Sequence, residues 1–141
     1  MHFACLVVLP QQVHTNGERF ILNYIDNALD NNNKYFDWYT VGGRFDGMFS
    51  DTYTPDRSDI NFPYDKNFRQ ITNNCYLVDD IIRKYMSDTQ NNSYVPYIID
   101  LDMVIHDINE ETTVGGDVAD KYIEILQKYI GKYVGLVDIH N

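Results

Sequence analysis

The stretch "FACLVVLP", residues 3–10, gives the clearest indication of the fold. Its residues are apolar on both alternating faces, which is the pattern of a strand covered on both sides by other elements. Pro10 ends the run, because proline has no N–H to donate to a neighbouring strand. We therefore expect a central strand that ends at Pro10.

Apolar residues at three- and four-residue spacing predict three amphipathic helices downstream. Thr15 and Glu18 form a plausible capping box for the first helix. Gly131 is placed to end the third helix at its C-terminal cap. The apolar positions of the three helices are Phe20, Ile21, Tyr24, Ile25, Ala28 and Leu29, then Leu77, Val78, Ile81, Ile82 and Tyr85, and finally Val118, Tyr122, Ile125, Leu126 and Tyr129.

Three further strands are expected between and after these helices. The first runs over Trp38–Val41 and continues through Arg44–Phe49 after a glycine pair. The second is "YVPYIIDLDMVIHD", residues 94–107, and the third is "KYVGLVDIH", residues 132–140. The polar segment 50–74 contains two prolines and is expected to be a long surface loop, a candidate lid.

The order of these elements predicts an α+β fold in a single domain, residues 1–141. Without the second helix, the order is β-α-β-β-α-β, the ferredoxin-like split β-α-β arrangement. In that arrangement an antiparallel sheet carries its helices on one face. The second helix and the long loop would be insertions into it.

The net charge and the apolar pattern of the sequence argue against some classes of function. With a net charge of -10 and only 11 Lys and Arg residues, an extended nucleic-acid or anionic-membrane surface is not expected. A small phosphate ligand remains compatible with this charge, because one or two Arg side chains suffice to hold it. The sequence has no apolar run of about 20 residues and no signal peptide pattern, so we expect a soluble intracellular protein. Cys5 and Cys75 have no metal-ligand spacing and are expected to be plain thiols.

The segment "DWYTVGGRFDG", residues 37–47, is the main candidate for function. Its Gly42-Gly43 pair would form a bulge or turn, and it lacks the spacing of a dinucleotide fingerprint or a P-loop. In one interpretation, Arg44 binds a phosphate and the rings of Trp38, Tyr39 and Phe45 stack on a base. In the other, Arg44 pairs with Asp37 or Asp46 and the rings fill the core.

"FDWYTVGGRFDG", residues 36–47, resembles the W-D-W-Y-x-I-G-G-R-W-x-G signature of small, mostly uncharacterised proteins of bacteriophages and some bacteria. Phe36, Val41 and Phe45 replace residues of the signature, and the resemblance extends weakly to most of the strands. The resemblance implies a phage or prophage origin and a location in the host cytoplasm. It also implies action against host defence, by sequestering a nucleotide second messenger such as a cyclic oligonucleotide or by occluding a host protein.

The leading hypothesis is a non-enzymatic module, without a cofactor, that sequesters a small nucleotide-like signalling molecule. A homo-oligomer is expected, since a deep pocket for sequestration is often built at a subunit interface. Arg57 and Arg69 are further candidate phosphate contacts. The complete set of candidate ligand-binding residues is Trp38, Tyr39, Gly42, Gly43, Arg44, Phe45, Arg57 and Arg69.

Two other function classes stay open. An acidic interaction protein would block a host defence factor directly or by mimicking DNA. A metal-dependent phosphodiesterase would require the last two strands to pair and bring acidic and histidine side chains together. Those side chains are Asp100, Asp102, His106, Asp107, Asp138 and His140.

Overall fold

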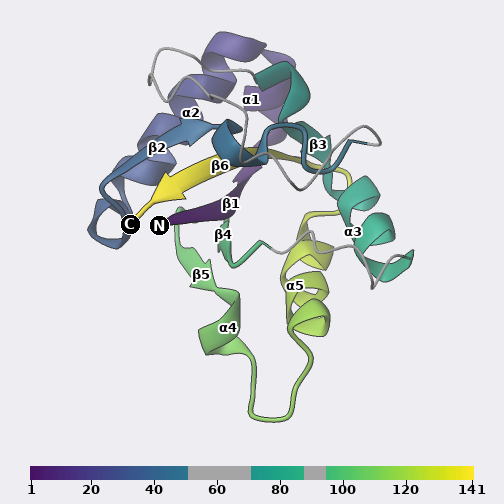
Figure 1. The fold of residues 1–141 in the computed structure, drawn as a ribbon. Helices are drawn as coiled ribbons and strands as arrows, with labels where there is room; N and C mark the ends of the chain where they lie inside the picture. Colours follow the sequence, from purple (N-terminus) through teal and green to yellow (C-terminus); the bar gives the residue numbers. More distant parts are fainter. Residues whose placement is uncertain (51–70, 88–94) are drawn as a thin grey trace.

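The computed structural model describes residues 1–50, 71–87 and 95–141. These residues form a mixed α+β fold around a six-stranded sheet (Figure 1). The strands follow the order β2-β6-β1-β4-β5, and β3 pairs with β6 as well. Their bounds are β1 His2–Leu9, β2 Trp38–Val41, β3 Cys75–Leu77, β4 Tyr97–Ile99, β5 Ile105–Asp107 and β6 Tyr133–His140.

Strand β1 lies at the centre of the sheet, as its sequence predicts. It pairs antiparallel with β6 along its whole length and parallel with β4. Residues from Ala4 to Leu9 are at most 1% exposed, so both faces of the strand are covered. The two ends of the described chain lie next to each other, because His2 pairs with His140 (Figure 1).

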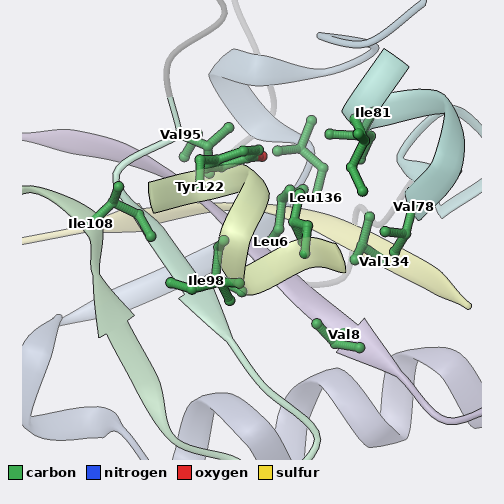
Figure 2. Packing of buried hydrophobic residues seen from close by; sticks show 14 of the residues in the cluster. Leu6, Val8, Val78, Ile81, Val95, Ile98, Ile108, Tyr122, Val134 and Leu136 are labelled. Atoms are coloured by element: carbon green, nitrogen blue, oxygen red, sulfur yellow. The ribbon is translucent and has the colours of Figure 1, made fainter. Parts of the chain in front are cut away.

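Helices cover both faces of this sheet. On one face, α2 (Glu18–Asp30) packs on Val7 and Leu9 of β1, and α1 (Gln11–Thr15) precedes it. On the other face, the buried residues of α3 (Val78–Ser87) and α5 (Val118–Leu126) pack against Leu6 and Val8. Figure 2 shows this second core, in which the ring of Tyr122 lies among aliphatic side chains.

The α+β class is therefore confirmed, but the ferredoxin-like arrangement is not. Its helices would lie on one face, whereas α2 and α5 lie on opposite faces here. Its sheet would be antiparallel, whereas β1 and β4 run parallel. The physical reason is the apolar character of both faces of the central strands, because each face needs its own helical cover.

The predicted capping box is wrong, although the helix that it introduces is confirmed. Thr15 ends α1, and its hydroxyl donates to the carbonyl oxygens of Gln11 and Gln12. Gly17 occupies the N-cap position of α2. The buried stripe of α2 consists of predicted apolar residues: Ile21, Ile25, Ala28 and Leu29.

The predicted strand over residues 94–107 is wrong, because the described part of it, residues 95–107, does not form one strand. Strands β4 and β5 are a hairpin, and the chain reverses between them through a turn organised by Asp100. Asp100 Oδ1 accepts hydrogen bonds from the backbone N–H groups of Asp102 and Val104, at 2.9 and 3.0 Å. Met103 has a positive φ of 61° in this turn. The alternating pattern of this segment therefore hides a reversal that depends on one side chain.

Strand β2 ends at Val41, and the predicted continuation over Arg44–Phe49 is wrong. A short 3₁₀ turn, Gly43–Phe45, follows instead.

Most of the predicted lid lies outside the described residues. α4 (Ile108–Glu111) joins the hairpin to the segment before α5. In the described part of the chain, no helix has the length and apolar character needed to cross a membrane.

Candidate ligand-binding site at the end of the sheet

The glycine pair forms a turn whose backbone passes directly over two buried polar side chains. Gly42 and Gly43 have φ values of 72° and 54°, in the left-handed region that favours glycine. A Cβ on Gly42 would lie 2.5 Å from Nδ2 of Asn74, and a Cβ on Gly43 would lie 2.5 Å from Oδ2 of Asp138. Both positions therefore require glycine for conformation and for space.

Asp138 holds one side of this turn. Its carboxylate is fully buried and accepts hydrogen bonds from the backbone N–H of Arg44, at 2.9 Å, and from His2, whose Nδ1 lies at 2.8 Å. Burial raises the pKa of Asp138 above the ordinary aspartate value, although the hydrogen bonds from Arg44 and His2 oppose that shift. This carboxylate therefore anchors the backbone of Arg44 and orients the ring of His2.

Asn74 holds the other side. Its side-chain oxygen accepts from the backbone N–H of Gly47 at 3.0 Å, and its amide donates to Asp46 at 2.8 Å. Its backbone carbonyl accepts from Leu136 of β6 at 2.7 Å. Asp46 and Gly47 are thus structural members of the motif, because they bind a residue that the chain places beside β3.

Three rings gather on the same end of the sheet. Trp38, His2 and His140 come from β2, β1 and β6, and the strand register places His140 between the other two. Trp38 stacks on His140, with ring centroids 4.9 Å apart and an interplanar angle of 11°. His2 meets both rings edge-on, at 5.4 and 5.1 Å. All three side chains are half-buried.

The backbone of Arg44 lies beside the strand that carries His140. Arg44 is exposed to solvent, and its backbone N–H donates a hydrogen bond to Asp138, which lies two residues from His140 in β6. Side chains two residues apart on a strand share a face of the sheet. We call His2, Trp38, Arg44, Asp138 and His140 the sheet-end cluster.

The other two predicted rings lie elsewhere. Tyr39 follows Trp38 in the strand and faces the opposite side of the sheet, where its hydroxyl donates to Asp26 of α2 and its ring meets Phe36 edge-on. Phe45 packs against the core on the α5 side. Trp38, Tyr39 and Phe45 therefore do not form one stacking surface, and the predicted Arg57 and Arg69 lie outside the described residues.

The proposed meeting of acidic and histidine side chains from the last two strands does not occur. Strands β1 and β4 lie between β6 and β5, so Asp138 and His140 are separated from Asp100 and His106. Within residues 1–50, 71–87 and 95–141, no group of three or more His, Cys, Asp or Glu side chains is arranged to hold a metal ion. The premise of the phosphodiesterase hypothesis is therefore wrong.

His106 forms a separate network instead. Its Nε2 lies 2.7 Å from Asp100 Oδ2, and its Nδ1 lies 3.0 Å from both carboxylate oxygens of Glu111 in α4. Burial disfavours the charged ring, but hydrogen bonds to Asp100 and Glu111 outweigh it and raise the pKa of His106 above the ordinary value. The network ties the turn between β4 and β5 to α4.

Two important residues escaped the sequence analysis. His2 shows no partner in the sequence, and the antiparallel pairing of β1 with β6 could have suggested His140 as its neighbour. Asn74 lies in a polar segment that resembles a loop, and nothing in its surroundings marks it as buried.

Burial raises the pKa of the Cys75 thiol to about 11, as expected of an unreactive cysteine.

In comparisons with family models, curated proteins and solved structures, no significant match to this chain is found.

Proposed function

We propose that the protein is a non-catalytic binding module that captures a small nucleotide-like ligand at the sheet-end cluster. The observation that carries this proposal is the position of Arg44. Its backbone is fixed to the buried carboxylate of Asp138, two residues along β6 from His140 of the Trp38–His140 stack, and the residue is exposed to solvent.

The chemistry of the cluster suits an anionic ligand with an aromatic ring. A guanidinium forms paired, charge-assisted hydrogen bonds with a phosphate. Tryptophan is a ring type on which nucleobases stack, and Trp38 is half-buried at this end of the sheet. His2 and His140 add ring nitrogens to the same end of the sheet, in a chain whose net charge is -10. Arg44 is thus the group of the cluster best suited to a phosphate, on a protein that is acidic as a whole.

Pre-organisation supports capture as the activity. The Gly42–Gly47 turn is held on one side by Asp138 and on the other by Asn74, so Arg44 loses little backbone freedom on binding. Lower ordering costs leave more of the interaction energy for affinity. A module of this kind can retain a ligand without converting it.

The resemblance of residues 36–47 to the phage signature supports the choice of ligand class. On that ground, we propose nucleotide second messengers of host defence as the ligands and the host cytoplasm as the place of action. We also propose assembly into a homo-oligomer, since a deep pocket for capture is often built at a subunit interface.

A thermal-shift panel tests this function. The wild-type protein is screened with cyclic dinucleotides, cyclic trinucleotides and ADP-ribose derivatives. We expect a stabilising shift with at least one of them, because a ligand that binds only the folded state raises the unfolding temperature. A panel without any shift contradicts the proposal.

A second candidate function rests on the acidic surface beside α4. Glu110, Glu111, Asp117 and Asp120 are all exposed within one short stretch of chain. Such a surface attracts a basic protein partner by long-range electrostatics. A stoichiometric host protein that is captured at low salt and released at high salt would favour this candidate, and its absence would favour the nucleotide ligand.

A further inference from the structure

A cavity of about 260 Å³ opens beside the edge strand β5, away from the sheet-end cluster. Among the described residues, its lining combines two aromatic rings, one aliphatic side chain and three carboxylates. Its lining residues are Tyr35, Tyr97, Ile105, Asp107, Glu110 and Glu111.

Three parts of the chain build this cavity. Tyr97 of β4 and Asp107 of β5 are direct partners across the hairpin, and Ile105 shares their face of the sheet. The short turn Asn33–Tyr35 after α2 brings in the ring of Tyr35. Helix α4 supplies Glu110 and Glu111. The site therefore depends on the tertiary fold, because its residues are up to 76 positions apart by their numbers, from Tyr35 to Glu111.

The lining favours a positively charged guest. The six described lining residues include three acids and no Lys, Arg or His. Tyrosine rings attract cations through the negative potential of their faces. Tyr35 already holds an ammonium group within this chain, since Nζ of Lys34 lies 5.1 Å from its ring centroid.

The carboxylates of the cavity also act on Tyr97. Burial raises the pKa of Tyr97 above the ordinary value, and the charges of Asp107 and Glu110 raise it further. The same potential that opposes a phenolate favours a bound cation.

The three carboxylates of the cavity differ in the hydrogen bonds that they form within the fold. Asp107 caps α4 by accepting the backbone N–H of Glu110 at 3.2 Å, and Glu111 binds His106. Glu110 lines the cavity and is exposed, and it is the carboxylate whose replacement disturbs these contacts least.

We propose that this cavity binds an alkylammonium group, with Tyr35 and Tyr97 against the cation and Glu110 as its principal charge partner. The volume suits a short amine, since pockets for drug-sized ligands start at roughly 300 Å³. The group can belong to a free diamine or to a lysine side chain of a protein partner. This site is independent of the nucleotide ligand proposed above.

Isothermal titration with a charged probe and an uncharged probe tests the site first. Diaminobutane carries the ammonium groups, and butanediol has a chain of the same length without charge. We expect saturable binding of diaminobutane and none of butanediol. Comparable binding of both probes, or binding of neither, overturns the proposal. Nα-acetyl-lysine methylamide forms the second arm, and tighter binding of this probe than of diaminobutane assigns the site to a protein lysine.

Variants locate the binding. Glu110→Gln and Tyr35→Leu are each expected to weaken diaminobutane binding about tenfold, as the loss of one charge pair or one ring contact predicts. Both residues are exposed, so their replacement leaves the core intact, and the unfolding midpoint verifies this. Glu124→Gln on α5, where the side chain is 64% exposed and pairs with Lys121, removes the same charge elsewhere and should leave binding unchanged. Equal affinity in Glu110→Gln and Glu124→Gln overturns the assignment.

Discussion

Gly43 lies so close to Asp138 that a Cβ on the glycine would be 2.5 Å from Oδ2 of the aspartate. The same oxygen accepts the N–H of Arg44, the next residue, across a sequence separation of 94 positions. The glycine pair and the arginine of the motif are therefore parts of one turn, built around a carboxylate from the last strand. This turn leaves the side chain of Arg44 exposed.

Replacing Gly43 with alanine should destabilise the protein by about 3 kcal/mol. The methyl group would meet Asp138 and Thr40, and the backbone would keep a φ of 54° that alanine disfavours. Urea unfolding monitored by Trp38 fluorescence measures the change. Gly131→Ala is the matched control, because Gly131 has a φ of 84° but nothing within 4 Å of its Cβ position. Its expected loss is only about 1 kcal/mol, and equal losses in both variants would contradict the close-contact explanation.

Exchanging the polar groups of Asn74 and Asp46 tests the second anchor of the turn. Asn74→Asp alone should cost about 3 kcal/mol of unfolding free energy, since two carboxylates would then face each other across a 2.8 Å contact in a buried setting. Adding Asp46→Asn restores a donor and an acceptor, so the double variant should recover most of the loss. A double variant that is less stable than Asn74→Asp would show that this hydrogen bond does not hold the turn.

Tyr39→Phe separates folding from binding. The phenylalanine keeps the ring against Phe36 but removes the hydroxyl that donates to Asp26. We expect a loss of about 1.5–3 kcal/mol in unfolding free energy, typical of a hydrogen bond to a charged group. Affinity for any nucleotide found in the panel should stay unchanged, because Tyr39 faces away from the sheet-end cluster. A large loss of affinity without a loss of stability would contradict this and would indicate that Tyr39 contacts the ligand.

The His106 network makes stability depend on pH. Hydrogen bonds to Asp100 and Glu111 raise the pKa of His106 in the folded state above the ordinary value of 6.5. The folded protein therefore holds this proton more tightly than the unfolded chain does. The resulting stabilisation is complete below about pH 6.5 and is lost as the pH rises through the folded-state pKa.

Comparison of the wild type with His106→Gln measures this effect. Their difference in unfolding free energy should be larger at about pH 5.5 than at about pH 8.5, because glutamine carries no ionisable proton. Chemical denaturation at a series of pH values gives both curves. Asp102 adds another charge to the turn held by Asp100. The ionic strength is therefore kept constant, so that the screening of this charge does not change across the series. A constant difference across the series would contradict the proposed role of the His106 proton.

The parts of the fold that local patterns determine could be predicted from the sequence. β1 follows from an apolar run, and α2 and α5 follow from three- and four-residue spacing. The reversal at Asp100 could not be predicted, because an alternating pattern continues through it and the turn depends on side-chain hydrogen bonds. Cover on both faces of β1 was implied by its own sequence, but the order of elements suggested helices on one face.

Residues 37–47 stand out in the sequence as a candidate site, but the side chains that surround them in the fold could not be predicted in full. Alternation along β2 already implies that Trp38 and Tyr39 face opposite ways. The contributions of His2, Asn74 and Asp138 depend on pairings between distant strands and loops, which a single sequence does not reveal. The glycines were correctly associated with close approach, and the structure identifies what approaches them.

The most direct test of the account is the affinity of three proteins for the nucleotide that gives the largest thermal shift. Isothermal titration compares the wild type with Arg44→Ala and with Arg83→Ala, whose arginine is also exposed but lies on α3 and pairs with Asp80. We predict that Arg44→Ala weakens binding by about 10- to 100-fold, as expected when a charge-assisted hydrogen bond is lost, and that Arg83→Ala binds like the wild type. Unchanged affinity in Arg44→Ala would contradict the central claim that the turn presents this arginine to a ligand.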